Sequence, residues 1–157
     1  VSPKAADGKR LGIAESDYED WSTVFHVNLF SAAMLSRLLL PVSRASQGTI
    51  VYISPIAGSG LHPIARPTYA CSKAALAAPP REPASALGRF GVRVNAISPG
   101  EIDTSILSPG TEKLVAQIPQ RRLGTPDEVA KAIYFLCIEA SSYVNGAELH
   151  INGGQHV

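Results

Sequence analysis

The sequence predicts an α/β fold built on a small parallel sheet. Three short apolar or β-branched runs predict buried strands, at residues 49–53, 92–97 and 148–151. Segments whose apolar residues recur at helical spacing alternate with these runs along the chain. Strands that alternate with helices through short connections favour parallel βαβ units and an α/β sandwich.

The first predicted helix begins at a capping box and ends near Ser43. Ser16 and Glu19 lie three residues apart, so that their side chains can satisfy free N–H groups at a helix start. Large apolar residues then recur from Trp21 to Leu39 at helical spacing. The breaker Gln47-Gly48 separates this helix from the first strand.

The second helical segment is predicted over residues 68–76, after a Gly- and Pro-containing loop. Three prolines follow it at Pro79, Pro80 and Pro83. Proline is costly inside a helix but is tolerated in the first turn, where the N–H groups lack helical partners anyway. The sequence therefore predicts that one helix stops near Ala77 and that another begins at Pro80.

The carboxyl-terminal third predicts a long loop, a helix and a last strand. Residues 99–122 show little regular pattern, apart from one short helix near residues 112–117. Thr125 and Glu128 form a second capping box, with Pro126 at the first helical position. The helix that begins there precedes the strand at 148–151.

Composition describes an ordinary soluble globular chain of one domain. Of its 157 residues 45% are hydrophobic and 17% are charged, with a net charge of +1, and the basic residues are scattered rather than clustered. These values give no indication of a nucleic-acid partner. The longest apolar stretch, residues 29–42, is interrupted by polar residues and is too short to span a bilayer, so no membrane role is expected.

Cysteine usage points to a reducing compartment. Cys71 and Cys137 lack metal-ligand spacing, and two thiols in a chain of this size suit the cytoplasm. We expect both to be buried small hydrophobic residues, and we expect no metal site. No secretory leader precedes the first helix in this sequence, which favours a cytoplasmic location.

The pair Tyr69 and Lys73 carries the clearest chemical signal. Residues four apart lie on one face of a helix. A phenol with a pKa near 10 exchanges protons poorly at neutral pH, whereas a neighbouring ammonium favours the phenolate. The pair is therefore suited to proton transfer to or from an alcohol or ketone. Surface Tyr and Lys also fall four apart by chance, so the signal depends on the rest of the chain.

The carboxyl ends of two predicted strands add a candidate ligand site. Ser54 follows the first strand, and Ser98-Pro99-Gly100 follows the second. In parallel α/β sheets ligands bind outside the carboxyl ends of the strands. The sequence therefore predicts a cofactor site at this edge.

Six motifs, in order, resemble those of the short-chain dehydrogenase/reductase (SDR) family. They are Val27-Asn28-Leu29, Ile50-Val51-Tyr52-Ile53-Ser54, Tyr69-x-x-x-Lys73, Asn95-Ala96-Ile97-Ser98-Pro99-Gly100, the run from Arg122 to Ala130, and the run from Gly146 to Gly154. The resemblance extends from about Asp17 to the end of the chain. It implies a Rossmann-type doubly wound parallel sheet, of which residues 1–157 would form strands five to seven with their helices, a truncated NAD(P)-binding domain.

The resemblance also implies a catalytic set and an activity. Tyr69 would be the acid/base that contacts the substrate oxygen, and Lys73 would lower the pKa of Tyr69 and bind the nicotinamide ribose. Asn28, at an irregular turn of the first long helix, would hold a water connecting Lys73 to solvent. The reaction would be hydride transfer between NAD or NADP and a small-molecule alcohol or ketone.

Cofactor contacts and a lid are implied downstream. Pro99, Gly100, Ile102 and Thr104 would bind the nicotinamide end of the cofactor, together with Tyr69 and Lys73. Residues 106–121 would be a mobile lid over the substrate, whose Leu and Ile residues favour a partly apolar pocket. The family's long helix after the Tyr builds an oligomer interface, so a homo-oligomer is expected, weakened by Pro79, Pro80 and Pro83.

Two departures from the family pattern leave an alternative open. The family's Gly-rich turn, which cradles the pyrophosphate at a helix N-terminus, lies in an amino-terminal half that these residues do not contain. Pro55 stands where the family has a substrate-orienting serine, and Ser54 or Ser59 would have to replace it. The alternative is a catalytically inactive remnant or an interaction module of the same ancestry.

Overall fold

The structure is a computed structural model that describes residues 11–54, 67–77, 80–105, 107 and 111–157. Within these residues helices and strands alternate as the sequence predicts. The elements are α1 (Tyr18–Phe25), η1 (His26–Phe30), α2 (Ser31–Ala45), β1 (Thr49–Ile53), α3 (Pro67–Ala77), α4 (Arg81–Gly88), β2 (Arg93–Pro99), α5 (Thr111–Val115), α6 (Pro126–Cys137), η3 (Glu139–Ser141) and β3 (Glu148–Ile151).

The described strands form one parallel sheet in the order β1-β2-β3. Thr49 of β1 pairs with Arg93 of β2 and Ile53 with Ile97, so that the first two strands run in register along their length. Pro99 at the end of β2 pairs with Ile151 at the end of β3. The carboxyl ends of the strands therefore meet at one edge of the sheet, as expected for a ligand-binding α/β fold.

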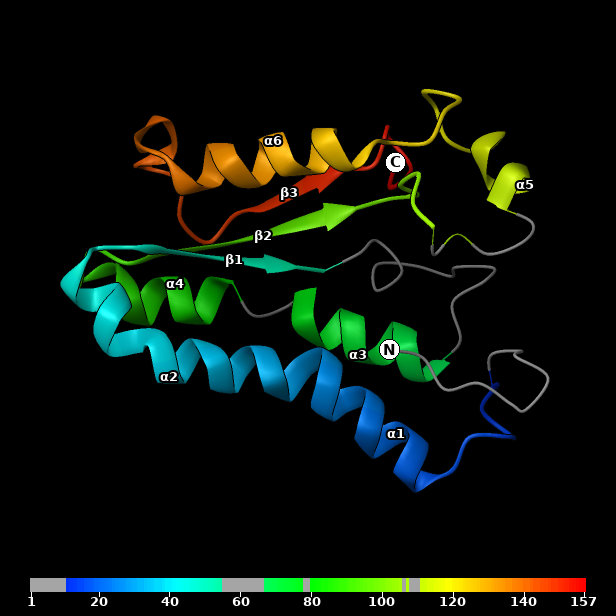
Figure 1. The fold of residues 1–157 in the computed structure, drawn as a ribbon, viewed down its shortest axis with the longest axis horizontal. Helices are drawn as coiled ribbons and strands as arrows, with labels where there is room; N and C mark the ends of the chain where they lie inside the picture. Colours follow the sequence, from blue (N-terminus) through cyan, green and yellow to red (C-terminus); the bar gives the residue numbers. More distant parts are fainter. Residues whose placement is uncertain (1–10, 55–66, 78–79, 106, 108–110) are drawn as a thin grey trace.

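Helices cover the two faces of the sheet unequally. The helices α1, α2, α3 and α4 lie on one face, and α6 lies on the other (Figure 1). The helix α5 and the chain's carboxyl terminus lie toward the carboxyl ends of the strands (Figure 1). This arrangement confirms the doubly wound α/β sheet that the sequence predicts.

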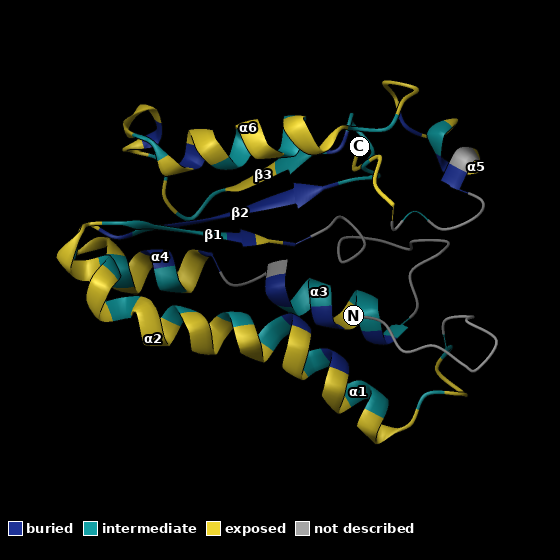
Figure 2. Cartoon of the chain, viewed as in Figure 1, coloured by how far each residue is buried: buried dark blue, intermediate teal, exposed yellow. Residues whose placement is uncertain are grey.

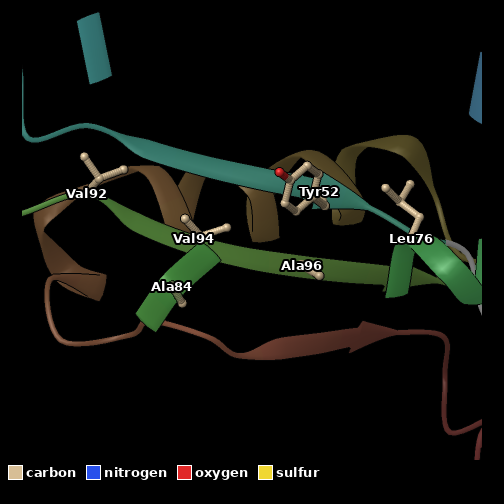
Figure 3. Close-up of a cluster of buried hydrophobic side chains, with 6 residues drawn as sticks. All are labelled: Tyr52, Leu76, Ala84, Val92, Val94 and Ala96. Carbon is tan, nitrogen blue, oxygen red and sulfur yellow. The ribbon is translucent and has the colours of Figure 1, made fainter. Parts of the chain in front are cut away.

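The core lies between the sheet and the α3–α4 layer. Buried side chains from β1, from β2 and the residue before it, and from α3 and α4 form one cluster. Figure 3 shows its members: Tyr52, Leu76, Ala84, Val92, Val94 and Ala96. The middle strand β2 is buried along almost its whole length. A strand buried along its length is typical of parallel sheets that are covered on both faces.

The first helix is capped one residue later than predicted. Asp17, not Ser16, is the N-cap, since its carboxylate accepts from the backbone N–H of Asp20 at 2.9 Å. The Asp20 side chain completes the capping box by accepting from the Asp17 N–H. The Ser16 hydroxyl instead accepts a hydrogen bond from the indole of Trp21 at 3.1 Å, which explains the shift.

The other helix boundaries follow the predictions closely. The helix α3 ends at Ala77, and Pro80 is the N-cap of α4, which places Pro83 in its first turn. Thr125 and Glu128 form the predicted capping box of α6, with Pro126 in the first turn. The break between α3 and α4 is therefore confirmed, while Pro79 lies outside the described residues.

The helix α2 leaves much of its surface exposed, as the broad exposed stripe in Figure 2 shows. Its exposed large apolar residues include Met34, Leu35, Leu38, Leu39 and Val42. Among the described residues, Tyr18–Ala45 is one helix long and apolar enough to cross a membrane by length and composition alone. Only 11% of its apolar window is buried, and of this helix Leu29 and Ala32 pack against the core cluster. One such helix is weak evidence for a membrane span.

Both cysteines are free and exposed, so the expectation that they are buried is wrong. In α3 the buried face is taken by Ser72 and Leu76, which leaves Cys71 on the outer side. In α6 Leu136 turns inward, so that the next residue, Cys137, faces away from the core. Within the part of the chain that the structure describes, no cluster of three metal-binding side chains is found.

Candidate active site

The helix α3 carries Tyr69 and Lys73 one turn apart, as the motif predicts. Both side chains are half-buried, and the Lys73 Nζ lies 6.0 Å from the centroid of the Tyr69 ring. Burial lowers the pKa of Lys73 below its ordinary value of 10.5, because a partly desolvated ammonium is less stable than a hydrated one. A phenol and an ammonium thus share one partly desolvated location.

Asn28 is buried, and it contacts α3 through the side chain of Ser72. The π-helical turn η1 places Asn28 among the buried residues, with 7% of its surface exposed. Its side-chain amide donates to the Ser72 hydroxyl at 2.9 Å, and that hydroxyl donates to the Tyr69 carbonyl at 2.8 Å. This chain of bonds connects the irregular turn to the first turn of α3.

Ser54 holds the same helix from the side of the sheet. Its side chain is fully buried, and its hydroxyl donates to the backbone carbonyl of Lys73 at 2.9 Å. Its backbone N–H donates to the carbonyl of Ile97 on β2, also at 2.9 Å. Ser54 therefore connects the carboxyl ends of two strands to α3, and its hydroxyl is engaged in that structural bond. Pro55 and Ser59 lie outside the described residues.

The segment after β2 is held by a second backbone connection. Ile102 forms an isolated parallel bridge with Gly124, where the Gly124 N–H donates to the carbonyl of Glu101 at 3.0 Å. The Asp103 N–H donates to the Gly124 carbonyl at 2.8 Å. Thr104 is exposed at the end of this segment. The loop that the resemblance assigns to the cofactor is thus fixed at its middle, and the Thr104 hydroxyl at its end donates to the carbonyl of Ile102 at 3.5 Å.

Gly100 lies directly against the turn that follows β3. Its N–H donates to the carbonyl of Ile151 at 3.0 Å. A Cβ at Gly100 would lie 2.6 Å from Gln155 Oε1 and 2.7 Å from Asn152 Cβ, closer than real Cβ contacts. The absence of a side chain at Gly100 is therefore required by the chain's own turn.

A cavity of about 250 Å³ lies beyond this turn. Its lining comes from Glu101, residues 118–128 and the stretch from His150 to Gly153. No described residue of α3 lines this cavity, so it is separate from the Tyr69–Lys73 pair. Two of the lid residues expected to favour an apolar pocket, Leu114 and Ile118, are buried side chains, and only Ile118 reaches this cavity.

The structure thus brings the predicted residues together in two groups. Tyr69, Lys73 and Asn28 form one group around α3. Pro99, Gly100, Ile102 and Thr104 form the other, after β2. Ser54 joins them through its bonds to Lys73 and Ile97.

Ser72 is the residue that sequence reasoning missed. The signal for it was available, since position 72 follows Tyr69 by three residues and therefore falls near the same helix face. A polar residue on a face that must pack against another helix requires a partner. That partner, Asn28, is distant in sequence and became identifiable only in the structure.

Known proteins resemble this chain throughout its length. A family model described as enoyl-(acyl carrier protein) reductase matches residues 3–156. Protein FixR of Bradyrhizobium diazoefficiens is 52% identical over 158 residues, which cover 100% of this chain and 57% of the relative. The 3-oxoacyl-[acyl-carrier-protein] reductase FabG of Thermotoga maritima is 37% identical over 145 residues, which cover 87% of this chain and 57% of the relative.

Solved structures give the same result. A 3-oxoacyl-[acyl-carrier protein] reductase from Brucella melitensis superposes with a TM-score of 0.91 at 33% identity, covering 100% of this chain and 60% of that one. A short-chain dehydrogenase/reductase from Brucella ovis, in complex with a partially ordered NAD, has a TM-score of 0.79 at 48% identity, covering 96% of this chain and 60% of that one. The chain therefore spans about three fifths of the length of these relatives.

Proposed function

Because the chain belongs to the short-chain dehydrogenase/reductase family, we propose that it serves an NAD(P)-dependent oxidoreductase that interconverts a hydroxyl and a carbonyl. The observation that carries the proposal is the placement of Tyr69 and Lys73 one turn apart on α3, both half-buried. The helix is held from two sides by side chains distant in sequence, Asn28 through Ser72 and Ser54 through its own hydroxyl. Proton transfer at a defined atom requires that the helix carrying the acid/base groups be held in place in this way.

The donor set suits the nicotinamide end of a dinucleotide. The phenol of Tyr69 and the ammonium of Lys73 can bond ribose and substrate hydroxyls, and the Thr104 hydroxyl can bond a carboxamide. These groups lie near the carboxyl ends of parallel strands, where α/β sheets bind nucleotides. We therefore assign Tyr69, Lys73, Pro99, Gly100, Ile102 and Thr104 to the cofactor. Whether the cofactor is NAD or NADP is decided by residues outside this set.

In the reductive direction the bound nicotinamide supplies the hydride. The substrate's carbonyl carbon receives that hydride while its oxygen receives a proton from the Tyr69 hydroxyl, so that one C–H and one O–H bond form. The phenolate left on Tyr69 is stabilised by the Lys73 ammonium, because a nearby cation favours the charged form of a phenol. Positioned acid/base groups of this kind contribute about 10² to 10⁴ in rate.

For the substrate we propose a 3-oxoacyl thioester as the first class to test. Two of the relatives, from Thermotoga maritima and Brucella melitensis, are named 3-oxoacyl-[acyl-carrier-protein] reductases. Their names describe reduction of a ketone at the β carbon of a thioester, which agrees with the Tyr69 and Lys73 chemistry.

The test is a fluorescence titration of the chain with NADH and with NADPH, followed by turnover with an acetoacetyl thioester. Saturable binding in the micromolar range, with oxidation of the reduced cofactor that depends on the thioester, would support the proposal. Absence of binding up to millimolar cofactor would contradict it for these 157 residues.

Two observations favour a second candidate, a non-catalytic interaction module. The chain spans about three fifths of its relatives, and α2 exposes a series of large apolar residues. Contiguous exposed apolar surface marks a contact site for another part of a protein or for a partner. Turnover of a ketone by the purified chain would contradict this candidate. A stable complex of the chain with itself or with a partner protein, without turnover, would support it.

A further inference from the structure

The turn Asn152–Gln155, which we call the post-β3 turn, lies between a segment that the proposed function assigns to the cofactor and the end of the segment that the resemblance implies as a lid. On one side it contacts Gly100, the glycine assigned to the cofactor. On the other side it contacts Ile118–Gln120, at the end of the segment that the resemblance identifies as the substrate lid. The contacts on both sides are tight enough to exclude a single additional carbon.

Contact with Gly100 is made by two side chains of the turn. A Cβ at Gly100 would lie 2.6 Å from Gln155 Oε1 and 2.7 Å from Asn152 Cβ. Asn152 is held in place, since its Oδ1 accepts from the Gly154 N–H at 3.1 Å and its side chain is almost fully buried. The turn and the cofactor segment are therefore packed directly against each other.

Contact with the lid end is made by the turn's two glycines. The Gln120 N–H donates to the Gly153 carbonyl at 3.2 Å. A Cβ at Gly153 would lie 2.9 Å from Ile118 Cγ2, and one at Gly154 would lie 3.0 Å from Pro119 Cγ. Both glycines adopt positive φ angles, so the turn's shape is set by its backbone.

We propose that the post-β3 turn is a positioning element that fixes the distance between Gly100 and Ile118–Gln120. Asn152 and Gln155 are then positioning residues for the cofactor segment, and a displacement of the lid end is transmitted to Gly100. This inference rests on the proposed function for its consequence, which is that lid position and cofactor affinity are coupled. Packed elements transmit displacement in this way because they are not continuously deformable.

The test changes the lid side of the turn and measures the cofactor side. Gly154→Ala introduces a methyl group whose three nearest atoms all belong to Pro119, the closest at 3.0 Å. Gly146→Ala is the matched control, since Gly146 also has a positive φ (75° against 88°) and its new Cβ would meet only Ala84 and Arg81, away from both segments. Both substitutions strain the backbone, so both are expected to lower the thermal midpoint by similar amounts.

Two readouts separate positioning from general strain. Amide exchange, measured by NMR on the ¹⁵N-labelled chain, reports on the Gly100 N–H bond to Ile151 and the Gln120 N–H bond to Gly153. The dissociation constant for NADH or NADPH reports on the cofactor segment. For Gly154→Ala we expect faster exchange at both amides and about tenfold weaker cofactor binding, since small misplacements at a site are costly. For Gly146→Ala both readouts stay at the wild-type value.

Rescue provides the second arm. Pro119→Ala removes the atom nearest to the new methyl group, so the double variant Gly154→Ala/Pro119→Ala should recover slow exchange at Gly100. Gln155→Ala, on the cofactor side, should speed exchange at Gly100 without affecting Gln120. The proposal is overturned if Gly154→Ala changes Gln120 alone, or if Gly146→Ala changes Gly100 equally.

The outcome is independent of whether the proposed function holds. If the wild-type chain binds neither NADH nor NADPH, the proposed function fails, but the amide exchange at Gly100 and Gln120 still decides whether the turn couples them. If the wild-type chain binds cofactor and Gly154→Ala leaves Gly100 unchanged, the positioning role fails while the proposed function stands.

Discussion

The side-chain amide of Asn28 donates a hydrogen bond of 2.9 Å to the hydroxyl of Ser72, across 44 residues of sequence. Both residues are buried, and the same hydroxyl donates to the carbonyl of Tyr69. The π-helical turn that contains Asn28 therefore has a defined structural consequence, which is to hold the first turn of α3. Irregular helical turns of this kind occur frequently at functional sites.

Ser72→Ala should destabilise the fold. The substitution removes the buried hydrogen bond from the Asn28 amide to the Ser72 hydroxyl and the one from that hydroxyl to the Tyr69 carbonyl, so the free energy of unfolding should fall by about 1–3 kcal/mol. Urea unfolding measures this value. Ser142→Ala, at an exposed position, is the control and should change the free energy by less than about 0.5 kcal/mol. Equal effects at both positions would show that the bond contributes nothing.

Tyr69→Phe should remove catalysis while leaving the fold intact. The phenol is the proposed proton donor, and general acid/base groups contribute about 10² to 10⁴ in rate, so turnover should fall by at least about a hundredfold. Circular dichroism and cofactor titration should show a folded chain. Tyr134→Phe, on the exposed face of α6, should retain the wild-type rate. A Tyr69→Phe variant with unchanged turnover would refute the catalytic assignment.

Lys73→Met should raise stability at neutral pH and remove activity. Burial lowers the pKa of Lys73 in the folded chain, so the unfolded chain binds more protons between that pKa and 10.5. The wild-type chain therefore gains stability relative to Lys73→Met as pH rises through this window. Unfolding free energies measured from pH 7 to 10.5 should show the advantage of the variant shrinking.

Lys131→Met is the matched control for that series, and its stability relative to wild type should change with pH in the opposite direction. The ion pair with Asp127 raises the pKa of Lys131, so its stabilising contribution is present below 10.5 and is lost as pH rises through the folded value. The variant should therefore be slightly less stable than wild type at pH 7, and the difference should vanish at high pH. If the stability of both variants relative to wild type changed with pH in the same direction, the lowered pKa of Lys73 and the raised pKa of Lys131 would both be contradicted.

Glu128→Gln should lower the free energy of unfolding at neutral pH and leave it unchanged in acid. The hydrogen bond from Arg122, with one from the Thr125 backbone, lowers the pKa of Glu128 from 4.5 to about 2. The contribution of the carboxylate is thus present above pH 4.5 and is lost as pH falls toward 2. Acid-unfolding curves of wild type and variant should converge over that window. Glu139→Gln, outside this network, tests whether removal of any exposed carboxylate has the same effect.

The secondary structure could be predicted because its signals are local. The strand at residues 49–53 was marked by a β-branched run, and the break between α3 and α4 was marked by proline chemistry. The N-cap of α1 was misplaced by one residue because Ser16 and Asp17 are both good caps. The bond from Trp21 to Ser16 decided between them.

The proposed acid/base pair is likewise a local feature, since a spacing of four residues on a helix fixes the relative position of Tyr69 and Lys73. The residues that support the pair are not local. Ser72 receives Asn28 from a different helix, and Ser54 reaches Lys73 from the end of a strand. Candidate partners for a buried polar side chain cannot be ranked from sequence alone, because each polar residue has many possible partners until the elements pack.

By itself the sequence determined the order of strands and helices, the position of the Tyr69–Lys73 pair and the family of the chain. These depend on periodicity, turn chemistry and short motifs, which act over a few residues. The tertiary structure alone decided which side chains are buried, which helix face is exposed, and why Gly100 must lack a side chain. Those properties arise from contacts between segments more than 40 residues apart, where packing density leaves room for one arrangement of atoms.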